Sequence, residues 1–319
     1  MDGGRIVVLG AGAMESLVVA RLAMANADVT LLGRPSDHLE RVARDGLELV
    51  ENEGSRRRVP LRAVAAPDAA AGADLLVVLV KSWATAEAVT PLCPHLPPTA
   101  TVVTLQNGLG NAAALRAALG PDAPPRELVV GVTAQAAMRE APGRVHHTGA
   151  GPTAVGRPDG AVTPALTAAA ALVAAGLPTV AVPDIERWVW RKLAVNAAIN
   201  GPTALAGVAN GARVADPDLL AAAAILAAEV AAVARARGLR IDRVGAAVEE
   251  IARDTAANRS SMLQDIEAGE QTEVDAIYGV MIAEAERLGI GVPASRVTAA
   301  LIRARERVAA RTDPDPDPT

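Results

Sequence analysis

Short apolar runs and helical stretches alternate along the first half of the chain. The β-branched run at positions 5–9 predicts a strand that is buried on both faces, and an apolar helix to about Asn26 follows it. The next strand is expected at 29–32, and a hairpin at 47–50 and 59–64. Further apolar runs predict strands at 73–80, 101–105, 128–132, 145–147, 153–155 and 179–182. This alternation indicates an α/β domain.

After Pro183 the pattern becomes helical almost throughout. Helices are predicted at 187–201, 217–237, 241–254, 258–267, 274–288 and 296–311, with the first ended by Gly201 and Pro202. We therefore expect an α/β domain over residues 1–183 and an all-helical domain over 184–312. The segment 313–319, rich in Pro and Asp, has nothing apolar to bury and is predicted to be a disordered tail.

The composition narrows the range of partners. The 319 residues are 51% hydrophobic, with no Phe and one Tyr, so the core must be aliphatic. The net charge is −5, and the only basic block, at 56–58, is expected to be solvated at a turn. A nucleic-acid surface needs a basic face and stacking aromatic residues. The composition therefore argues against a nucleic-acid partner.

The single cysteine and the start of the chain bear on the compartment. Cys93 has no partner for an internal disulfide, which fits a reducing compartment. The N-terminus runs into a strand without a signal-peptide pattern. The apolar stretch 161–183 is interrupted by Pro164, Gly176 and Pro178, so we expect a helix and a strand there rather than a membrane span. These features predict a cytoplasmic protein.

A glycine loop separates the first strand from the first helix. Gly10 permits a tight turn, and Gly12 lets backbone N–H groups approach a pyrophosphate at the helix N-terminus. Strand, glycine loop, helix and strand within about 30 residues predict a Rossmann-like dinucleotide-binding domain. Arg34 stands at the end of the second strand, where an NAD site would place a carboxylate, so it favours the 2′-phosphate of NADP over a plain surface role. The loop itself comprises Gly10, Ala11, Gly12, Ala13, Met14 and Glu15.

Glu15 departs from this pattern, because it replaces the third glycine. Like charges ~4 Å apart repel by roughly 1–4 kcal/mol in wet to partly wet surroundings. A carboxylate in a first helical turn is otherwise favourable. We hypothesise that Glu15 must swing aside for NADPH and that it weakens NADPH binding.

Polar side chains recur on one face of the predicted helix at 187–201. Lys192, Asn196 and Asn200 are spaced by four residues, and apolar residues spread over the other sides, so this polar face is expected to be buried. Buried amines and amides need partners, which loop carbonyls or, for Lys192, water would also supply. Lys81 and Asn107 follow strands at the edge where ligands bind in α/β sheets.

Other candidates have a structural interpretation when taken alone. The segment 258–265 begins with a cap-like Asn258, and Thr272-Glu273 precedes the next helix. His146-His147 has no Cys or carboxylate at ligand spacing, so no metal site is expected. His38 and His95 are expected to face solvent.

Taken together, these pieces resemble the ketopantoate reductase (2-dehydropantoate 2-reductase) family from about position 6 to 309. The order and spacing of the motifs are jointly specific, although each alone is weak. The motifs are G-A-G-A-M at 10–14, L-L-G-R at 31–34, V-K-S at 80–82, Q-N-G-L-G at 106–110, K-L-A-V-N-A-A-I-N at 192–200, N-R-S-S-M-L-Q-D at 258–265 and T-E-V-D at 272–275.

The resemblance implies reduction of the keto group of ketopantoate by NADPH, giving pantoate for coenzyme A synthesis. It implies that Lys192 is the proton donor and that Glu273 lies near the nicotinamide and substrate. Ser261 and Asn258 match the substrate-carboxylate site, and Asn107 matches a residue that touches cofactor and substrate. Further matches are Asn196, Asn200 and Asn210 as substrate contacts, and Lys81 and Ala137 as cofactor contacts alongside the glycine loop.

The chemistry agrees with this implication. A keto oxygen that gains charge needs a nearby acid, and Lys192 suits that role if burial lowers its pKa towards neutrality. Glu273 would oppose this shift by stabilising the ammonium, so the sequence leaves the balance open. We expect the ligand cleft between the two domains.

Two alternatives remain open. One is a related NADPH-dependent reductase of another 2-oxo acid, because pocket shape sets that selectivity. The other is a binding or regulatory protein that has lost turnover through Glu15. The apolar Ala- and Leu-rich helices would supply a homodimer face.

Overall fold

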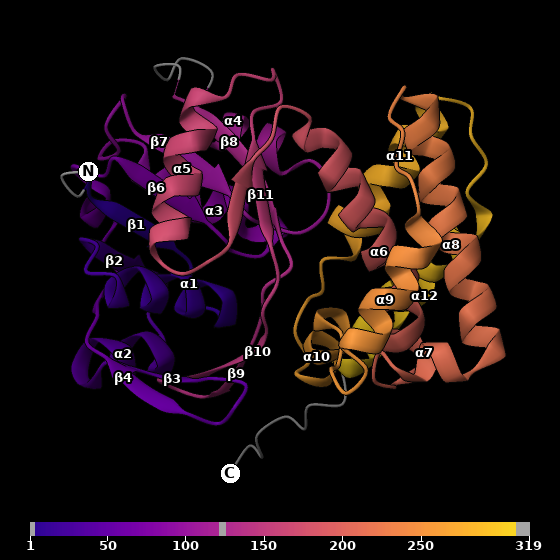
Figure 1. Ribbon diagram of the computed structural model, residues 1–319, viewed down its shortest axis with the longest axis horizontal. Helices are drawn as coiled ribbons and strands as arrows, with labels where there is room; N and C mark the ends of the chain where they lie inside the picture. Colours follow the sequence, from indigo (N-terminus) through magenta and orange to yellow (C-terminus); the bar gives the residue numbers. More distant parts are fainter. Residues whose placement is uncertain (1–3, 121–125, 311–319) are drawn as a thin grey trace, which may run out of the picture. The chain divides into compact units, whose positions relative to one another are not determined.

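The computed structural model describes residues 4–120 and 126–310, so the predicted tail at 313–319 lies outside the described residues. The chain forms two compact units, each described here by itself (Figure 1). One unit comprises residues 1–106 and 111–186, and the other comprises 107–110 and 187–319. The short loop 107–110 thus belongs to the helical unit although the chain on both sides of it belongs to the α/β unit.

The α/β unit is built on an eight-stranded sheet in the order β12-β11-β8-β7-β6-β1-β2-β5. The six adjacent strands β8, β7, β6, β1, β2 and β5 run parallel to one another. Strand β11 runs antiparallel to β8. Leu9 pairs with Val78, and Val78 with Thr104, so the loops that follow β1, β6 and β7 leave from one edge. The strands are β1 (Ile6–Leu9), β2 (Val29–Leu32), β5 (Arg62–Val64), β6 (Leu75–Val78), β7 (Thr101–Thr104), β8 (Leu128–Thr133), β11 (Thr153–Gly156) and β12 (Thr179–Ala181).

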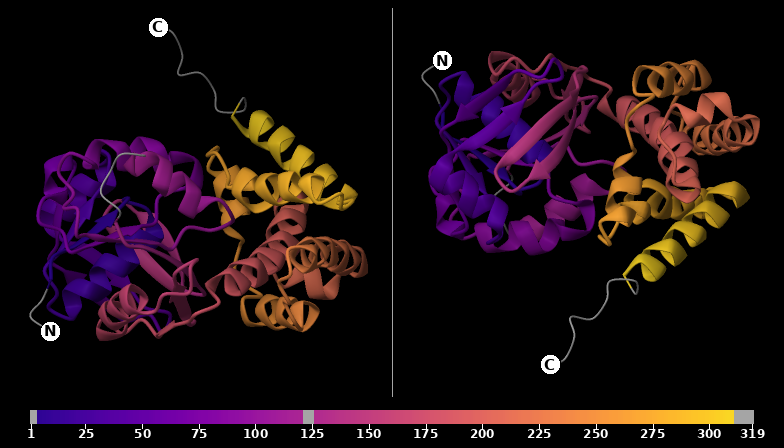
Figure 2. Two further views of the ribbon diagram at one scale, coloured as in Figure 1. Left: turned by 90° about the horizontal axis from the view of Figure 1, so that it is seen from above. Right: turned by 90° about the horizontal axis from the view of Figure 1, so that it is seen from below.

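Both faces of this sheet are buried, because its strands are apolar at successive positions. In β1, Ile6 and Val8 pack into the core that also contains residues of α1 and α5, whereas Val7 and Leu9 pack into the core beside α3 and α4. Helices therefore lie on both sides of the sheet, as Figures 1 and 2 show. The helices of this unit are α1 (Ala13–Met24), α2 (Asp37–Asp45), α3 (Thr85–Val89), α4 (Asn111–Leu119) and α5 (Thr163–Ala174), with short 3-10 turns at Pro67–Ala70, Ser82–Ala84 and Thr90–Leu92.

A second sheet of four strands, ordered β4-β3-β10-β9, corrects the predicted hairpin. Its strands are β3 (Leu47–Val50), β4 (Arg56–Val59), β9 (Ala136–Ala141) and β10 (Arg144–Gly149). Only β4 pairs with β3, whereas β5 joins the first sheet beside β2. Pro60 separates them and has no backbone N–H for a ladder. The basic run 56–58 lies in β4 rather than in a turn. Arg56 and Arg58 form ion pairs with Glu48 of β3.

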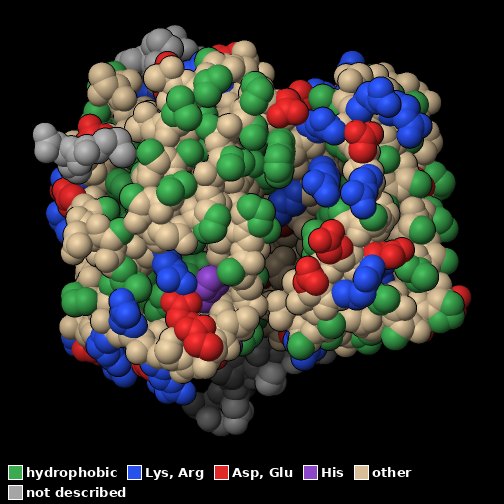
Figure 3. Space-filling view, viewed as in Figure 1, with side chains coloured by type: hydrophobic (Ala, Val, Ile, Leu, Met, Phe, Trp, Pro, Cys, Tyr) green, Lys and Arg blue, Asp and Glu red, His purple; other side chains and the backbone are tan. Residues whose placement is uncertain are grey.

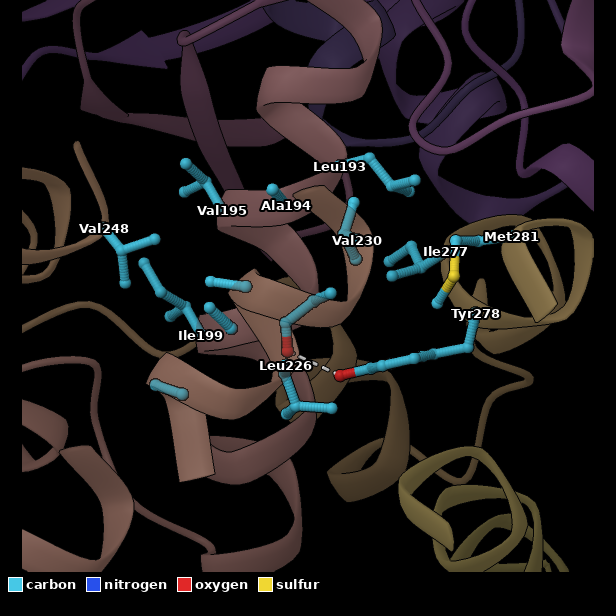
Figure 4. Packing of buried hydrophobic residues seen from close by; sticks show 14 of the residues in the cluster. Leu193, Ala194, Val195, Ile199, Leu226, Val230, Val248, Ile277, Tyr278 and Met281 are labelled. Carbon is cyan, nitrogen blue, oxygen red and sulfur yellow. Dashed lines mark hydrogen bonds between the residues drawn. The ribbon is translucent and has the colours of Figure 1, made fainter. Parts of the chain in front are cut away.

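The helical unit encloses its own aliphatic core. Leu193 and Ile199 of α6 pack with Leu226 and Val230 of α8 (Figure 4). Charged side chains of both signs lie next to one another on its visible surface (Figure 3). Its helices are α6 (Ile185–Ala206), α7 (Ala212–Ala215), α8 (Pro217–Ala236), α9 (Val244–Asp254), α10 (Ser261–Glu267), a π-helical turn η4 (Asp275–Gly279), α11 (Val280–Arg287) and α12 (Pro293–Ala309).

The prediction that α6 ends at Gly201 was wrong, because the helix continues through Pro202 to Ala206. A proline inside a helix leaves a carbonyl without its N–H donor. The carbonyl concerned is that of Ala198, and hydroxyl groups donate to the carbonyl oxygens of its two neighbours: Tyr278 to that of Ala197 (2.6 Å) and Thr203 to that of Ile199 (2.7 Å). The Tyr278 bond appears as the dashed line in Figure 4.

Among the described residues, α8 is the one helix long and apolar enough to cross a membrane by length and composition. Its Leu226, Val230 and Val233 belong to the core of the helical unit. The apolar stretch 161–183, which raised the same question, forms the short helix α5 followed by strand β12.

Candidate functional site

A lysine, an asparagine and a glutamate are joined by hydrogen bonds within the helical unit. Lys192 Nζ donates to Asn107 Oδ1 (2.8 Å), and Asn107 Nδ2 donates to Glu273 Oε2 (3.0 Å). Glu273 is buried, and Lys192 and Asn107 are partly buried. Residues from positions far apart in the sequence thus form one connected group, which we call the amine–amide–carboxylate group.

The charge state of Lys192 follows from its surroundings. Burial lowers the pKa of Lys192 to about 8, while the Glu273 carboxylate opposes this by favouring the ammonium. This answers the question that the sequence left open, because desolvation outweighs the carboxylate. An amine with such a pKa is still mostly protonated at neutral pH, and it releases its proton more readily than an exposed lysine.

The loop after β7 positions Asn107. Its neighbour Gln106 is buried and donates to the Val80 carbonyl oxygen (2.7 Å) and to Thr85 Oγ1 (2.8 Å). On the other side, Gly108 has a positive φ of 83°, and a Cβ at this position would overlap the Ala276 carbonyl group. These contacts hold the loop in one conformation, which orients the Asn107 amide.

The segment after Glu273 is a π-helical turn, which is rare and often found at functional sites. The Leu109 amide donates to the Ala276 carbonyl oxygen (2.9 Å), so this turn holds the Asn107 loop from the other side. The same turn carries Tyr278, whose hydroxyl bonds to α6, the helix of Lys192. The π-helical turn therefore holds both the loop that carries Asn107 and the helix that carries Lys192.

The asparagines of α6 lie in the same helix as Lys192. Asn196 is partly buried and Asn200 is buried, in line with the expected polar face. Asn210 lies beyond the end of α6, where its Nδ2 donates to Thr255 Oγ1 (3.0 Å). Its Oδ1 is buried without a hydrogen-bond partner among the described residues. Asn210 therefore keeps one acceptor unused.

The start of α10 differs from the prediction. The N-cap is Ser260 rather than Asn258, because Ser260 Oγ accepts from the Leu263 amide (3.3 Å). Ser260 also shares a hydrogen bond with Thr203 Oγ1 (3.0 Å), which ties α10 to α6. Ser261 is the first residue of α10 and is exposed, while Asn258 accepts from the Asn210 amide through its carbonyl oxygen (2.9 Å).

The glycine loop lies in the α/β unit, between β1 and α1. Gly10 has a φ of 115°, and Gly12 is the N-cap of α1, with no side chain capping its first turn. Such a turn suits an anion, because its backbone N–H groups point outward. The Glu15 side chain, however, folds back over both glycines: a Cβ at Gly12 would lie 2.7 Å from Glu15 Oε2, and one at Gly10 would overlap Oε1. The loop fits a dinucleotide phosphate only with Glu15 in another rotamer.

Three further predicted cofactor contacts also belong to the α/β unit. Arg34 follows β2 and is exposed, with Glu87 Oε1 3.4 Å from its Nη1. Lys81 follows β6 and is partly buried, as is Ala137 in β9. Arg34 and Lys81 thus follow β2 and β6, the two strands that pair with β1 on either side, whereas Ala137 comes from the second sheet.

Comparisons with known proteins match nearly the whole chain. The family described as Ketopantoate reductase PanE/ApbA matches residues 6–160, and Ketopantoate reductase PanE/ApbA C terminal matches residues 184–306. The 2-dehydropantoate 2-reductase of Halobacterium salinarum is 40% identical over 95% of this chain and 99% of that protein. This chain belongs to the ketopantoate reductase family.

Other members of the ketopantoate reductase family agree. The 2-dehydropantoate 2-reductase of Archaeoglobus fulgidus is 36% identical over 95% of this chain and 98% of that protein. A crystal structure of a PanE/ApbA family ketopantoate reductase from Ralstonia eutropha JMP134 has a TM-score of 0.86 at 32% identity, covering 96% of this chain and 99% of that one. The predicted fold, a Rossmann-like α/β part followed by helices, is confirmed.

The histidines of this ketopantoate reductase were misjudged in part. His38 is buried rather than solvent-facing: its Nδ1 accepts from the Gly143 amide (3.1 Å), and its Nε2 bonds to Ser16 Oγ (2.9 Å). His147 is hydrogen-bonded to Glu51 and Gln135. Both residues are too far from His147 in the sequence for the contacts to be predicted from residue spacing. Within the described ranges, no group of three His, Cys, Asp or Glu side chains is arranged to hold a metal.

Four residues with structural roles around this family's site were not singled out beforehand. Gln106 and Thr203 looked like ordinary loop and helix residues, and Ser260 stood next to the more conspicuous Ser261. Tyr278, the only tyrosine in the chain, was the one with a usable signal, because a lone tyrosine in an aliphatic core needs a partner for its hydroxyl.

Proposed function

We propose that this protein reduces ketopantoate (2-dehydropantoate) to pantoate with NADPH, in the biosynthesis of pantothenate and coenzyme A. The curated relatives that carry this activity in their names support the substrate. The single observation that carries the mechanism is the amine–amide–carboxylate group with Lys192 at a pKa of about 8. A general acid is most useful with a pKa near the working pH.

We assign Lys192 as the proton donor to the keto oxygen. NADPH, when bound, supplies the hydride that reduces the keto carbon. The oxygen then carries developing negative charge, and the Lys192 ammonium transfers a proton to it, leaving a neutral amine and a hydroxyl group. Asn107 accepts a hydrogen bond from that ammonium, so it orients the acid without taking its proton. Glu273, reached through Asn107, keeps enough charge nearby to hold Lys192 protonated between turnovers.

The remaining polar residues are proposed to hold the substrate. Asn196 and Asn200 share α6 with the acid, and their amides offer neutral donors that do not compete for its proton. Ser261, exposed at the first turn of α10, and Asn258 suit the substrate carboxylate, because N–H groups at a helix start attract anions. The unused acceptor of Asn210 suits a substrate hydroxyl.

For the cofactor, we propose NADPH rather than NADH. Arg34 supports this choice, because it is a cation at the end of β2 where NAD-binding proteins carry a carboxylate. The backbone of Gly10 to Met14 is assigned to the pyrophosphate, and Lys81 and Ala137 to further cofactor contacts. We likewise propose residues 1–183 as the cofactor domain and 184–312 as the substrate domain of a cytoplasmic enzyme.

We also propose a homodimer. Leu220 and Ile225 of α8 are exposed, at 38% and 53%, on a helix whose apolar window is only 33% buried. Exposed apolar side chains on one helix are typical of subunit interfaces. Light scattering of the purified protein gives the test, and a monomer at micromolar concentration would contradict it.

The function is tested by following NADPH oxidation with ketopantoate and with a panel of other 2-oxo acids. We expect the highest kcat/KM for ketopantoate. A higher value for another 2-oxo acid would assign the protein to a related reductase. Absence of both NADPH binding and turnover would instead support a binding or regulatory role, which the position of Glu15 over the glycine loop favours.

A further inference from the structure

The space over the glycine loop is filled by a side chain of the same chain. Glu15 is only 6% exposed, and its two carboxylate oxygens lie above Gly10 and Gly12. Gly10 makes the tight turn of the loop, and Gly12 lets the backbone approach a dinucleotide phosphate. An anion that belongs to the protein therefore takes up the room that an anionic ligand would need.

The backbone beneath Glu15 is held on both sides, so opening of the loop requires a movement of the Glu15 side chain. The Gly10 amide donates to the Leu32 carbonyl oxygen (2.8 Å), which holds the start of the loop on the sheet. Ser16, the next residue, is fully buried and bonded to His38, which in turn accepts from the Gly143 amide. Both ends of the segment are thereby anchored, and a rotamer change of Glu15 is the shortest route to an open loop.

We infer that Glu15 is an internal occupant of the phosphate site and sets the affinity of this protein for its cofactor. A dinucleotide phosphate binds only after the Glu15 carboxylate rotates out, and its charge opposes the phosphate even then. The inference rests on the proposed function, because it assumes that the glycine loop receives the cofactor. It adds Glu15 as a residue that lowers cofactor affinity, whereas the backbone of the rest of the loop raises it.

The position of Glu15 makes its effect distinct from that of Arg34. The pyrophosphate is common to NADPH and NADH, so removal of Glu15 strengthens the binding of both cofactors by the same factor. Arg34 follows a different strand and would act only on the 2′-phosphate, which NADH lacks. The two residues therefore control separate quantities, overall affinity and cofactor choice.

The test compares dissociation constants of NADPH and NADH, measured by titration calorimetry, for the wild type, Glu15→Gly and Glu15→Gln. We expect Glu15→Gly to bind both cofactors about tenfold more tightly or better, because it removes charge and bulk. Glu15→Gln removes only the charge and is expected to fall between the two. Unchanged or weaker binding of both cofactors by both variants would overturn the inference.

A matched control and a structural readout complete the experiment. Glu53→Gln makes the same change of net charge at an exposed turn of the same unit and is expected to leave both dissociation constants unchanged. If Glu15→Gly does not fold, Glu15→Gln alone decides, because it keeps the side-chain shape. In a crystal structure with NADPH, the wild-type Glu15 carboxylate should have left Gly10 and Gly12. A carboxylate still over both glycines would contradict the inference.

Turnover separates this inference from the proposed function. Tighter binding by Glu15→Gly without reduction of ketopantoate would support the role of Glu15 and refute the substrate. Reduction of ketopantoate by the wild type, with the same cofactor affinity in all variants, would support the function and refute the role of Glu15.

Discussion

The amine–amide–carboxylate group and the glycine loop are both polar sites, but they are organised in opposite ways. In the first, both charged side chains are hydrogen-bonded to the same neutral amide: Lys192 donates to Asn107, and Asn107 donates to Glu273. In the second, Glu15 occupies the space that a ligand needs. A site for a proton donor must be assembled before substrate arrives, whereas a binding loop tolerates a removable obstacle at the cost of affinity.

The largest effect should come from removing the amine. Lys192→Ala is expected to lower kcat by about 10²–10⁴-fold, the usual contribution of a general acid, with little change in NADPH affinity. Steady-state kinetics and a cofactor titration give the two numbers. Arg191→Ala, which alters the exposed neighbour on the same helix, is the control and should keep near-normal turnover. Comparable kcat in both variants would remove Lys192 as the acid.

A smaller loss should follow from moving the amide. Gly108→Ala places a Cβ against the Ala276 carbonyl group at a positive φ, so the loop must shift and carry Asn107 with it. Displacement by about 1 Å is enough to lower kcat by up to about 10²-fold. Gly110→Ala has a similar φ of 85° but meets only Val280, at 3.5 Å, so it isolates the backbone strain. Equal kcat in the two variants would show that the overlap is unimportant.

The pH dependence tests the charge of the same group. Because the pKa of Lys192 is lowered to about 8, its acidic form is lost as the pH rises above that value. We expect kcat to fall about tenfold per pH unit beyond it, since the protonated fraction falls at that rate. A kcat that stays level up to the ordinary lysine pKa of 10.5 would contradict this assignment.

On the cofactor side, Arg34→Ala should weaken NADPH binding by about fivefold, the size expected for an exposed ionic contact worth about 1 kcal/mol. NADH binding should not change, because NADH lacks the 2′-phosphate. Glu87→Gln removes the carboxylate beside Arg34 and should shift NADPH affinity slightly in the opposite direction. Parallel loss of both cofactors in Arg34→Ala would mean that Arg34 does not set cofactor choice.

The smallest effect concerns His38, which is hydrogen-bonded to Ser16 next to the glycine loop. Burial, and then the Arg139 charge, lower the pKa of His38 below 6.5. The folded state therefore favours the neutral ring, and stability that is present above pH 6.5 is lost as the pH falls through the lower folded value. Urea unfolding between neutral and mildly acidic pH measures this, and His38→Gln should reduce the slope. An identical slope in the variant would show that other groups dominate.

The sequence was sufficient where the pattern is local. The apolar runs located β1, β2, β7 and β8, and the glycines marked the loop because a strand and a helix flank them directly. The predictions of secondary structure failed where contacts between residues distant in sequence determine it. The second sheet needs β3 and β10 to pair across about a hundred residues. Pro202 lies inside α6 rather than at its end, in a stretch whose carbonyls also accept from the hydroxyl groups of Tyr278 and Thr203.

The candidate site shows the same division. The spacing of Lys192, Asn196 and Asn200 predicted one helical face, but it gave no sign that burial would outweigh Glu273 in setting the lysine pKa. The charge of Glu15 was readable, whereas the direction of its side chain was not. Ser260 rather than Asn258 caps α10, and its hydroxyl is also shared with Thr203, which lies 57 positions away in the sequence.

One of the limits between the two units falls on the peptide bond that joins Gln106 to Asn107. Strand β7 of the α/β unit ends shortly before it, at Thr104, and the following loop contributes the Asn107 amide to the helical unit. A chimera or split protein cut near position 186 would therefore produce a carboxyl-terminal fragment that has Lys192 and Glu273 but no group to bridge them. Exchange of halves between relatives should succeed only when the short loop 107–110 comes from the same parent as the helices.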